Sequence, residues 1–397
     1  MDEITRHRIE KEIEQFIASI DRSAVCELAS AYHPKKQPCR IFDVEKKGAF
    51  NICFPVEFLE DATGARATGE RWMVRIPLLP RLAFPEEKLR GEIATMKFIA
   101  EKTTIPIPYL HGYSIGKVNV LGLPFMLLEF IDGKPLINVN VSELPDAEMR
   151  RFFAKLGDIY LQLFQHKFDH IGALTLDSNN EHWVFENNRP LSVLMNEQTL
   201  ANLNPCRFIS PNQVYHSTVD YVFMIHQAIL DDLHRVPGSI SSEEDARAYL
   251  YNIHQSRQYL MEWIKPELNH GPFVLMHGDL RSSNIIVDDN LNIVSVLDWE
   301  WTHTIPAQMF VAPSWFTGYE LIGVTKEYDR LHYEALVFNF EMETRAIERR
   351  YHPECRDIRE LPLAKLWTKS FGSPDLFIAH GLMQPLYFGN RMSRKLS

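Results

Sequence analysis

The apolar positions of the chain follow a helical period at first and shorter, strand-like runs afterwards. Isoleucine and phenylalanine recur at helical spacing between Ile9 and Ile20, which predicts an amphipathic helix near the start. After Pro38 the apolar runs become short, as is typical of strands joined by loops. The predicted strands are 40–46, 50–60 and 71–78, with 61–70 as a hairpin loop. Strands in series favour an antiparallel meander.

A second helical pattern covers 86–102 and is followed by two more predicted strands, 111–115 and 124–130. The turn Asp132–Pro135 then closes the strand-rich region, so we place a boundary between two lobes there. Beyond it the pattern is mostly helical. The predicted helices are 146–163, 218–236 and 243–264, and the stretch 170–216 is too irregular for assignment.

The stretch 273–301 carries the most informative pattern, because it alternates apolar strands with polar turns. A polar loop is followed by a predicted hairpin with strands at 285–288 and 293–297. Asn284 comes just before the first strand and Asp298 just after the second, so the two side chains are neighbours in an antiparallel hairpin. An amide oxygen and a carboxylate are suitable ligands for one hard cation. The expected cation is Mg²⁺ bound to the phosphates of a nucleotide.

Asp279 lies on the same loop, five residues before Asn284. A carboxylate there could accept the proton of an attacking hydroxyl while the metal holds the phosphates. Ordinary turn chemistry also favours Asp and Asn, but three such residues at this spacing make that explanation the weaker one.

The run His277-Gly278-Asp279, with Asn284 and then Asp298-Trp299-Glu300, resembles the catalytic motifs of the aminoglycoside phosphotransferase and choline kinase group. These are small-molecule kinases with a protein-kinase-like fold. The resemblance covers roughly 40–320 and is strongest to the fungal aminoglycoside-phosphotransferase-like proteins. It implies that Asp279 is the catalytic aspartate, that Asn284 and Asp298 hold Mg²⁺, and that His277 supports the loop.

The resemblance also places a nucleotide, ATP or alternatively GTP, in the strand-rich lobe. A short loop at the first hairpin would cover the phosphates, although one glycine there is equally typical of an ordinary turn. The segment that links the lobes would bind adenine through its backbone. The residues assigned to these two parts are Gly48, Phe50, Asn51, Leu128, Glu129 and Phe130.

Glu92 lies on the apolar face of the helix 86–102, where a carboxylate needs a partner. The family pairs this glutamate with a lysine of the third strand, and the matching residue here is Arg75. Arginine keeps the charge and could bind Glu92 or a phosphate, but its planar fork is not equivalent to an ammonium. A purely structural ion pair stays open as the alternative.

Arg281 and Glu300 are assigned as motif-supporting residues. The run Arg281-Ser282-Ser283 stands where family members often carry His-Pro-Gly, and Arg281 could face a phosphate or an acidic substrate. Glu300 could bind substrate or cap the strand end. Aromatic residues nearby could cage a cationic substrate, but core packing is the favoured explanation. They are Trp299, Trp301, Trp315, Phe316 and Tyr319.

Charge and composition narrow the partners. The 397 residues carry 42 Lys plus Arg and 52 Asp plus Glu, a net charge of −10, so we expect a small-molecule partner and not a nucleic acid. From residue 301 onward the counts are 12 and 11, which does not favour a polycationic acceptor. Five scattered cysteines, no leader pattern and no apolar run long enough for a membrane predict a cytoplasmic protein.

We therefore expect an α+β, two-lobed, protein-kinase-like fold with an N-terminal antiparallel sheet and helix and a mainly helical C-terminal lobe. Residues 1–39 would form a helical extension, 40–132 the nucleotide-binding lobe, and 133–397 the lobe with the catalytic loop 277–284 and the acceptor site. The expected reaction is ATP- and Mg²⁺-dependent phosphate transfer to a small-molecule hydroxyl. The main alternative is a pseudokinase-like nucleotide-binding module. Arg75 at the position of the family lysine favours this alternative.

Two further classes fit less well. A metallophosphoesterase needs several His and Asp clusters, which the sequence does not show. A protein kinase is disfavoured because the Asp-Phe-Gly and Ala-Pro-Glu signatures are missing and Trp299-Glu300 replaces Phe-Gly.

Overall fold

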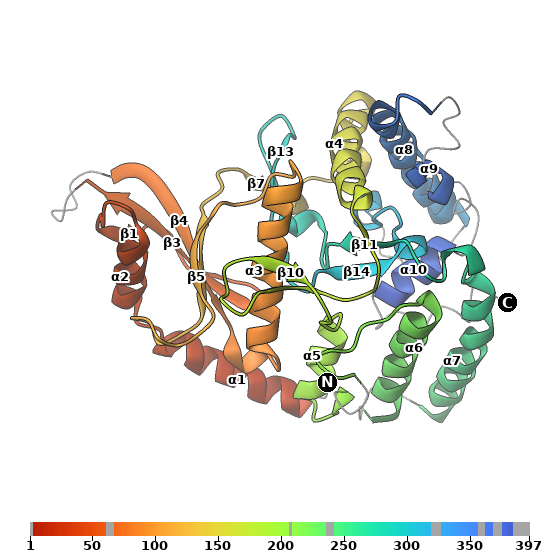
Figure 1. Cartoon of the computed structure of the whole chain (residues 1–397), viewed down its shortest axis with the longest axis horizontal. Coiled ribbons are helices and arrows are strands. Elements are labelled where there is room, and N and C mark those ends of the chain that lie inside the picture. The colour runs from red at the N-terminus through yellow and green to blue at the C-terminus, as the bar shows by residue number, and fades with distance from the viewer. Residues whose placement is uncertain are drawn as a thin grey trace.

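The chain forms two lobes, one built around an antiparallel sheet and one mainly helical (Figure 1). This computed structural model describes residues 3–60, 67–205, 209–235, 242–318, 327–355, 362–367 and 375–383. The helix α3 (Pro85–Lys102) lies between the sheet and the helical lobe in Figure 1. The expected α+β, two-lobed fold is confirmed.

The N-terminal sheet has the strand order β1-β3-β4-β6-β5, with β2 also paired to β3, and all of these pairs are antiparallel. Its strands are β1 (Cys39–Ile41), β2 (Lys46–Lys47), β3 (Asn51–Leu59), β4 (Ala67–Pro77), β5 (Leu110–Ser114) and β6 (Phe125–Glu129). The predicted strand 40–46 is wrong as one element, since it divides into β1 and the start of β2. The loop predicted up to residue 70 is also too long, because the polar start of β4 still pairs with β3.

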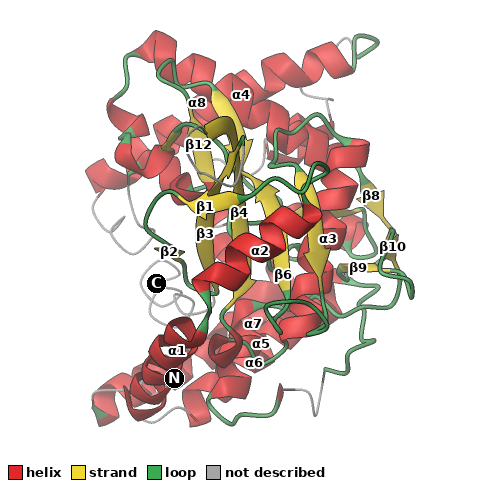
Figure 2. Ribbon diagram, turned by 90° about the vertical axis from the view of Figure 1, so that its left-hand side faces the viewer, coloured by secondary structure: helices red, strands yellow, loops and turns green. Residues whose placement is uncertain are grey.

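Alternate residues of β6 enter different cores, because helices cover both faces of the sheet. Phe125 and Leu127 pack with α1 (Glu3–Ser19) and α2 (Arg22–Tyr32), whereas Met126 and Leu128 pack with α3. Figure 2 shows α2 lying across the sheet. The predicted N-terminal extension is thus helical, and it shares its hydrophobic core with the sheet.

The helical lobe is assembled around α4 and three small groups of strands. Its helices are α4 (Asp146–Gln165), α5 (Val193–Leu200), α6 (Thr218–Arg235), α7 (Glu243–Trp263), α8 (Glu327–Tyr351), α9 (Pro362–Trp367) and α10 (Asp375–Met383). Its strands are β7 (Lys134–Pro135), β8 (Lys167–Phe168), β9 (Leu174–Leu176), β10 (Trp183–Phe185), β11 (Phe273–Met276), β12 (Ile285–Val287), β13 (Ile293–Val296) and β14 (His303–Pro306). They pair as β14-β11-β8, β13-β12-β7 and β10-β9. The unassigned stretch 170–216 thus contains two short strands and α5.

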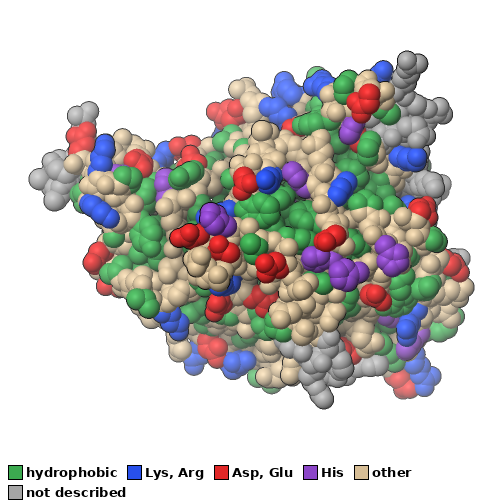
Figure 3. Space-filling model, viewed as in Figure 1, with side chains coloured by type: hydrophobic (Ala, Val, Ile, Leu, Met, Phe, Trp, Pro, Cys, Tyr) green, Lys and Arg blue, Asp and Glu red, His purple; other side chains and the backbone are tan. Residues whose placement is uncertain are grey.

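Two further properties of the structure are the distribution of charged side chains on its surface and the hydropathy of its helices. On the face drawn in Figure 3, described lysine and arginine side chains are interspersed with aspartate and glutamate, and no continuous basic patch covers that face. Among the described residues, no helix is both long and apolar enough to cross a membrane.

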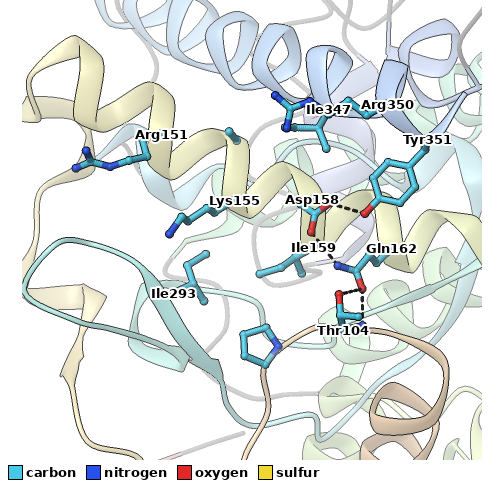
Figure 4. Close-up of a pocket in the computed structure, with 12 residues that line it drawn as sticks. Thr104, Arg151, Lys155, Asp158, Ile159, Gln162, Ile293, Ile347, Arg350 and Tyr351 are labelled. Atoms are coloured by element: carbon cyan, nitrogen blue, oxygen red, sulfur yellow. Dashed lines mark hydrogen bonds between the residues drawn. The ribbon is translucent and has the colours of Figure 1, made fainter. Parts of the chain in front are cut away.

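A cavity of about 670 Å³ lies between α4, α8 and the segment that follows α3 (Figure 4). In its wall, Gln162 of α4 accepts a hydrogen bond from the backbone N–H of Thr104 at 2.7 Å and donates to Asp158 at 2.8 Å. Asp158 in turn accepts a hydrogen bond from the hydroxyl of Tyr351 at 2.6 Å. This chain of contacts ties the end of α3 to both α4 and α8.

We expect Gln162→Leu to lower the free energy of unfolding by about 1–3 kcal/mol, because leucine cannot accept the Thr104 N–H bond. Chemical denaturation of both proteins measures the difference. Gln258→Leu is the control, because Gln258 donates only to Glu262 on the exposed surface of α7. Equal stability of the wild type and Gln162→Leu would contradict the prediction.

Candidate active site

His277 holds the catalytic-loop backbone through both of its ring nitrogens. Nε2 lies 3.0 Å from the carbonyl oxygen of Leu297, and Nδ1 accepts the backbone N–H of Asp279 at 3.0 Å. Burial lowers the pKa of His277 to about 4, so the ring is neutral at physiological pH with its proton on Nε2. These contacts fit the loop-supporting role that the sequence predicts for His277.

Gly278 lets the loop pass directly over the backbone that follows Asp298. A Cβ at this position would lie 2.6 Å from the carbonyl carbon and oxygen of Trp301 and 2.8 Å from the carbonyl oxygen of Glu300. Because these are backbone atoms, the loop has to shift if a side chain is added.

We therefore expect Gly278→Ala to destabilise the protein by about 1–3 kcal/mol and to displace Asp279. Gly116→Ala is the matched control, since a Cβ there meets no atom within 4 Å. Thermal unfolding compares the two variants with the wild type. A Gly278→Ala protein as stable as Gly116→Ala would disprove the close approach.

Asp279 is held from two sides. The amide nitrogen of Asn284 donates to its carbonyl oxygen at 2.8 Å and to Oδ2 at 3.2 Å, and Arg281 Nε lies 3.0 Å from Oδ2. Burial raises the pKa of Asp279 to about 6, although the Arg281 charge opposes the shift. The group is therefore mostly a carboxylate above neutral pH and can still accept a proton.

Asn284 and Asp298 meet where the hairpin β12–β13 ends. Ile285 pairs with Val296, and the N–H of Leu297 donates to the carbonyl oxygen of Asn284 at 2.8 Å. Within the part of the chain that the structure describes, the side-chain oxygen of Asn284 has one long contact, 3.4 Å from Ser283 Oγ, which leaves it acceptor capacity for a cation. Asp298 has a left-handed backbone, φ +65°, so the chain leaves the extended conformation of a strand at this residue.

Arg75 of β4 reaches the same place from the other lobe. Its Nη2 lies 3.0 Å from Glu92 Oε1, 3.3 Å from Glu300 Oε2 and in contact with Asp298 Oδ1. Burial opposes ionisation of Asp298, but the charges of Arg75 and Lys88 hold the pKa of Asp298 below its usual value. The predicted pair Arg75–Glu92 is present, and it belongs to a larger cluster.

Lys88 is a member of this cluster that the sequence analysis missed. Its side chain is 0% exposed, and Nζ lies 3.0 Å from Glu92 Oε2 and contacts Glu300 Oε2. Burial favours the neutral amine, yet the charges of Glu300 and Glu92 raise the pKa of Lys88 above its usual value. The available signal was its position four residues before Glu92, which places both on one helix face.

Phe50, in the loop after β2, and Asn51, the first residue of β3, contact the helical lobe. Asn51 Nδ2 donates to Glu300 Oε2 at 2.9 Å, and the Phe50 ring packs against Trp301 with centroids 5.0 Å apart. Glu300 therefore faces the buried cluster, which fits the motif-supporting assignment made from the sequence, and its contact with a substrate stays a prediction. The Gly48 N–H donates to the Asn51 carbonyl at 2.8 Å, as in an ordinary hairpin turn.

The segment that links the lobes uses its amides within the sheet. The N–H of Glu129 donates to Tyr109 O at 2.8 Å and that of Phe130 to Arg71 O at 3.1 Å. Leu128 is buried, and the Phe130 ring lies 4.9 Å from the Arg71 guanidinium. In this structure neither of the two amides is left for a nucleobase.

The aromatic residues near the motif support the packing explanation and not a cation cage. Trp299 and Phe316 are 1% exposed and Trp301 is 6% exposed. Trp315 is partly buried against the same core, and Tyr319 lies outside the described residues.

The residues present fit a nucleotide with a divalent cation. Glu92, Asp298 and Glu300 bring carboxylate oxygens within 4.8 Å of one another, and two cations balance most of their charge. Arg75 Nε is buried without a hydrogen-bond partner, so the guanidinium has donor capacity left. An open amide oxygen, a carboxylate and an unsatisfied guanidinium are the groups that a metal-bound phosphate needs.

Similar proteins give this arrangement a family. The sequence model of the phosphotransferase enzyme family matches residues 60–309. A protein of Zygosaccharomyces rouxii named Altered inheritance of mitochondria protein 9, mitochondrial, is 31% identical over 103 residues, 24% of this chain and 17% of that protein. Clavilactone A biosynthesis cluster protein Y of Ampulloclitocybe clavipes is 26% identical over 245 residues, 58% of this chain and 54% of that protein.

Solved structures of low sequence identity resemble the chain more loosely. The GDP complex of an aminoglycoside 2′-phosphotransferase-IIIa mutant has a TM-score of 0.46 at 12% identity, covering 94% of this chain and 100% of that one. An ethanolamine kinase of Plasmodium vivax has a TM-score of 0.45 at 14% identity, covering 89% and 80%. These scores lie below 0.5, so the assignment rests on the family model.

The matched region contains Arg75, Lys88 and Glu92 of the buried cluster. It also contains the whole loop 277–284 and Asp298. It covers well over half of the chain, whereas the chain spans about a sixth to about a half of the length of these two curated relatives. The chain belongs to the phosphotransferase enzyme family.

Proposed function

We propose that the protein transfers a phosphate from Mg²⁺-bound ATP to a hydroxyl of a small molecule. The observation that carries this proposal is the convergence of Asp279, Asn284 and Asp298 at the end of one hairpin, opposite Arg75 of the other lobe. An acid–base group, two oxygen ligands and a phosphate-binding cation are the parts that phosphoryl transfer requires.

Each residue has a separate task in this proposal. Asp279 orients the acceptor hydroxyl and takes its proton, and Asn284 fixes the Asp279 carboxylate through the 3.2 Å bond. Asn284 and Asp298 would hold Mg²⁺, which when bound neutralises phosphate charge. Arg75 would bind a phosphate oxygen through its Nε–H, and Glu92 holds the guanidinium in place.

The strand-rich lobe 40–132 is the proposed nucleotide lobe, and ATP the proposed donor with GTP as the alternative. Two solved structures similar in fold are GDP complexes of aminoglycoside 2′-phosphotransferase-IIIa. We also propose a cytoplasmic location, although several curated relatives are named mitochondrial. Imaging of the tagged full-length chain distinguishes the two compartments.

A second candidate is a nucleotide-binding module without turnover. Arg75 at the position of the family lysine favours it, because a guanidinium and an ammonium bind phosphate with different geometry. The intact set Asp279, Asn284 and Asp298 favours the enzyme.

A transfer assay tests the proposal. The protein is incubated with labelled ATP, Mg²⁺ and a panel of amino sugars, amino alcohols and cell-extract metabolites. We expect label in at least one acceptor. A folded protein that binds Mg²⁺-ATP but labels no acceptor would favour the binding module instead.

A further inference from the structure

We propose that this chain divides the task of the family lysine between two cations, with Arg75 facing the phosphates and Lys88 holding Glu92 and Glu300 in place. The inference rests on the proposed function, because it assigns a role toward a nucleotide. It makes Lys88 a positioning residue, which acts through the carboxylates and does not itself bind the nucleotide.

The Lys88 ammonium is directed at the cluster. Nζ donates to Glu92 Oε2 at 3.0 Å and to Asn51 Oδ1 at 3.3 Å, and it forms an ion pair with Glu300 Oε2. The side chain is 0% exposed. Its acceptors come from α3, from the first residue of β3 and from the segment after β13, so one buried ammonium joins both lobes.

Arg75 has a hydrogen-bond donor left for a ligand. All of its short contacts with Glu92, Asp298 and Glu300 use the single atom Nη2. Nε is buried with no hydrogen-bond partner among the described residues, so the guanidinium keeps an unused donor although it already touches three carboxylates. The planar fork can therefore bind a phosphate without releasing them.

The charge balance explains why both cations are needed. With Glu92, Asp298 and Glu300 all ionised, three negative charges face the two positive charges of Arg75 and Lys88, which leaves −1. If Lys88 were neutral, Arg75 alone would face three buried carboxylates, with a balance of −2. Its guanidinium would then be held by Glu92 and Glu300, and the site would repel phosphate.

The test compares Lys88→Met with the charge-compensated double variant Lys88→Met/Glu300→Gln. The double variant removes one cation and one carboxylate, so its balance returns to −1. ADP binding is measured by calorimetric titration without Mg²⁺, and thermal unfolding checks the fold. We expect Lys88→Met to weaken ADP binding by at least about tenfold and the double variant to regain affinity within about threefold of the wild type. Glu86→Gln is the control, because it removes an exposed carboxylate of the same helix, outside the cluster, and should not weaken binding.

Several outcomes would overturn the proposal. Unchanged ADP binding by Lys88→Met means that Lys88 has no role toward the nucleotide. A folded double variant as weak as Lys88→Met means that Lys88 contacts the nucleotide directly. If Lys88→Met does not fold, the double variant carries the test, and its failure to bind ADP within about threefold of the wild type overturns the proposal.

Arg75→Lys tests the other half and keeps the charge. A lysine there has three donors for Glu92, Asp298 and Glu300 and none for phosphate, so we expect at least about tenfold weaker ADP binding with little change in thermal stability. Wild-type affinity in this variant would overturn the assignment of Arg75. A wild-type protein that binds no ADP would instead remove the proposed function, and the roles of both cations with it.

Discussion

Replacing Asp279 with asparagine is expected to lower phosphate transfer by about 10²- to 10⁴-fold while ADP binding stays unchanged. Asparagine keeps the size of the side chain and its contact with Asn284, but it cannot take the hydroxyl proton. The steady-state rate of transfer is measured with the acceptor found in the panel, and ADP affinity is measured by calorimetry. Together they distinguish a slower reaction from weaker binding. Transfer at the wild-type rate would remove Asp279 from the mechanism.

Arg281→Ala is the companion variant for this experiment. Arg281 is exposed, and its Nε contacts the Asp279 carboxylate at 3.0 Å. After its removal Asn284 still donates to the same carboxylate, so the base stays in place. We expect a change of less than about tenfold in transfer, because an exposed ion pair contributes little. A loss as large as that of Asp279→Asn would show that Arg281 itself takes part, as a phosphate or substrate contact.

Elements with strong periodicity were predictable. The helix predicted at 86–102 is confirmed as α3, and the hairpin that ends at Asp298 is confirmed with β12 and β13 slightly shorter than predicted. These segments bury one face against a core, which fixes the spacing of their apolar residues. The short strands β9 and β10 escaped because three residues are too few to show a period.

The candidate site was predictable where its chemistry lies within one segment. Asp279, Asn284 and Asp298 come from twenty consecutive residues, so spacing alone could bring them together. Lys88 was not found, because a lysine four residues before a glutamate is typical of a solvent-exposed helix surface. Its burial depends on Glu300, more than two hundred residues away, and on Asn51. Such a partner is visible only once the lobes are in contact.

Asp298→Asn is expected to lower transfer by at least about a hundredfold without destabilising the protein, because it removes a metal ligand from a site that carries excess negative charge. After the change, Arg75 and Lys88 face only Glu92 and Glu300, and the buried charges balance. Asparagine also tolerates the left-handed backbone at this position, φ +65°, so no strain is added.

The two effects of Asp298→Asn are measured by transfer rates over a range of Mg²⁺ concentrations and by thermal unfolding without Mg²⁺. We expect a higher Mg²⁺ requirement and an unfolding temperature equal to or above that of the wild type. Asp289→Asn is the control on the same hairpin, because Asp289 forms only an exposed ion pair with Lys134. Wild-type transfer at low Mg²⁺ would remove Asp298 from the metal site. A large loss of stability would instead show that the bond to Arg75 holds the two lobes together, which would give the Asp298 carboxylate a structural role.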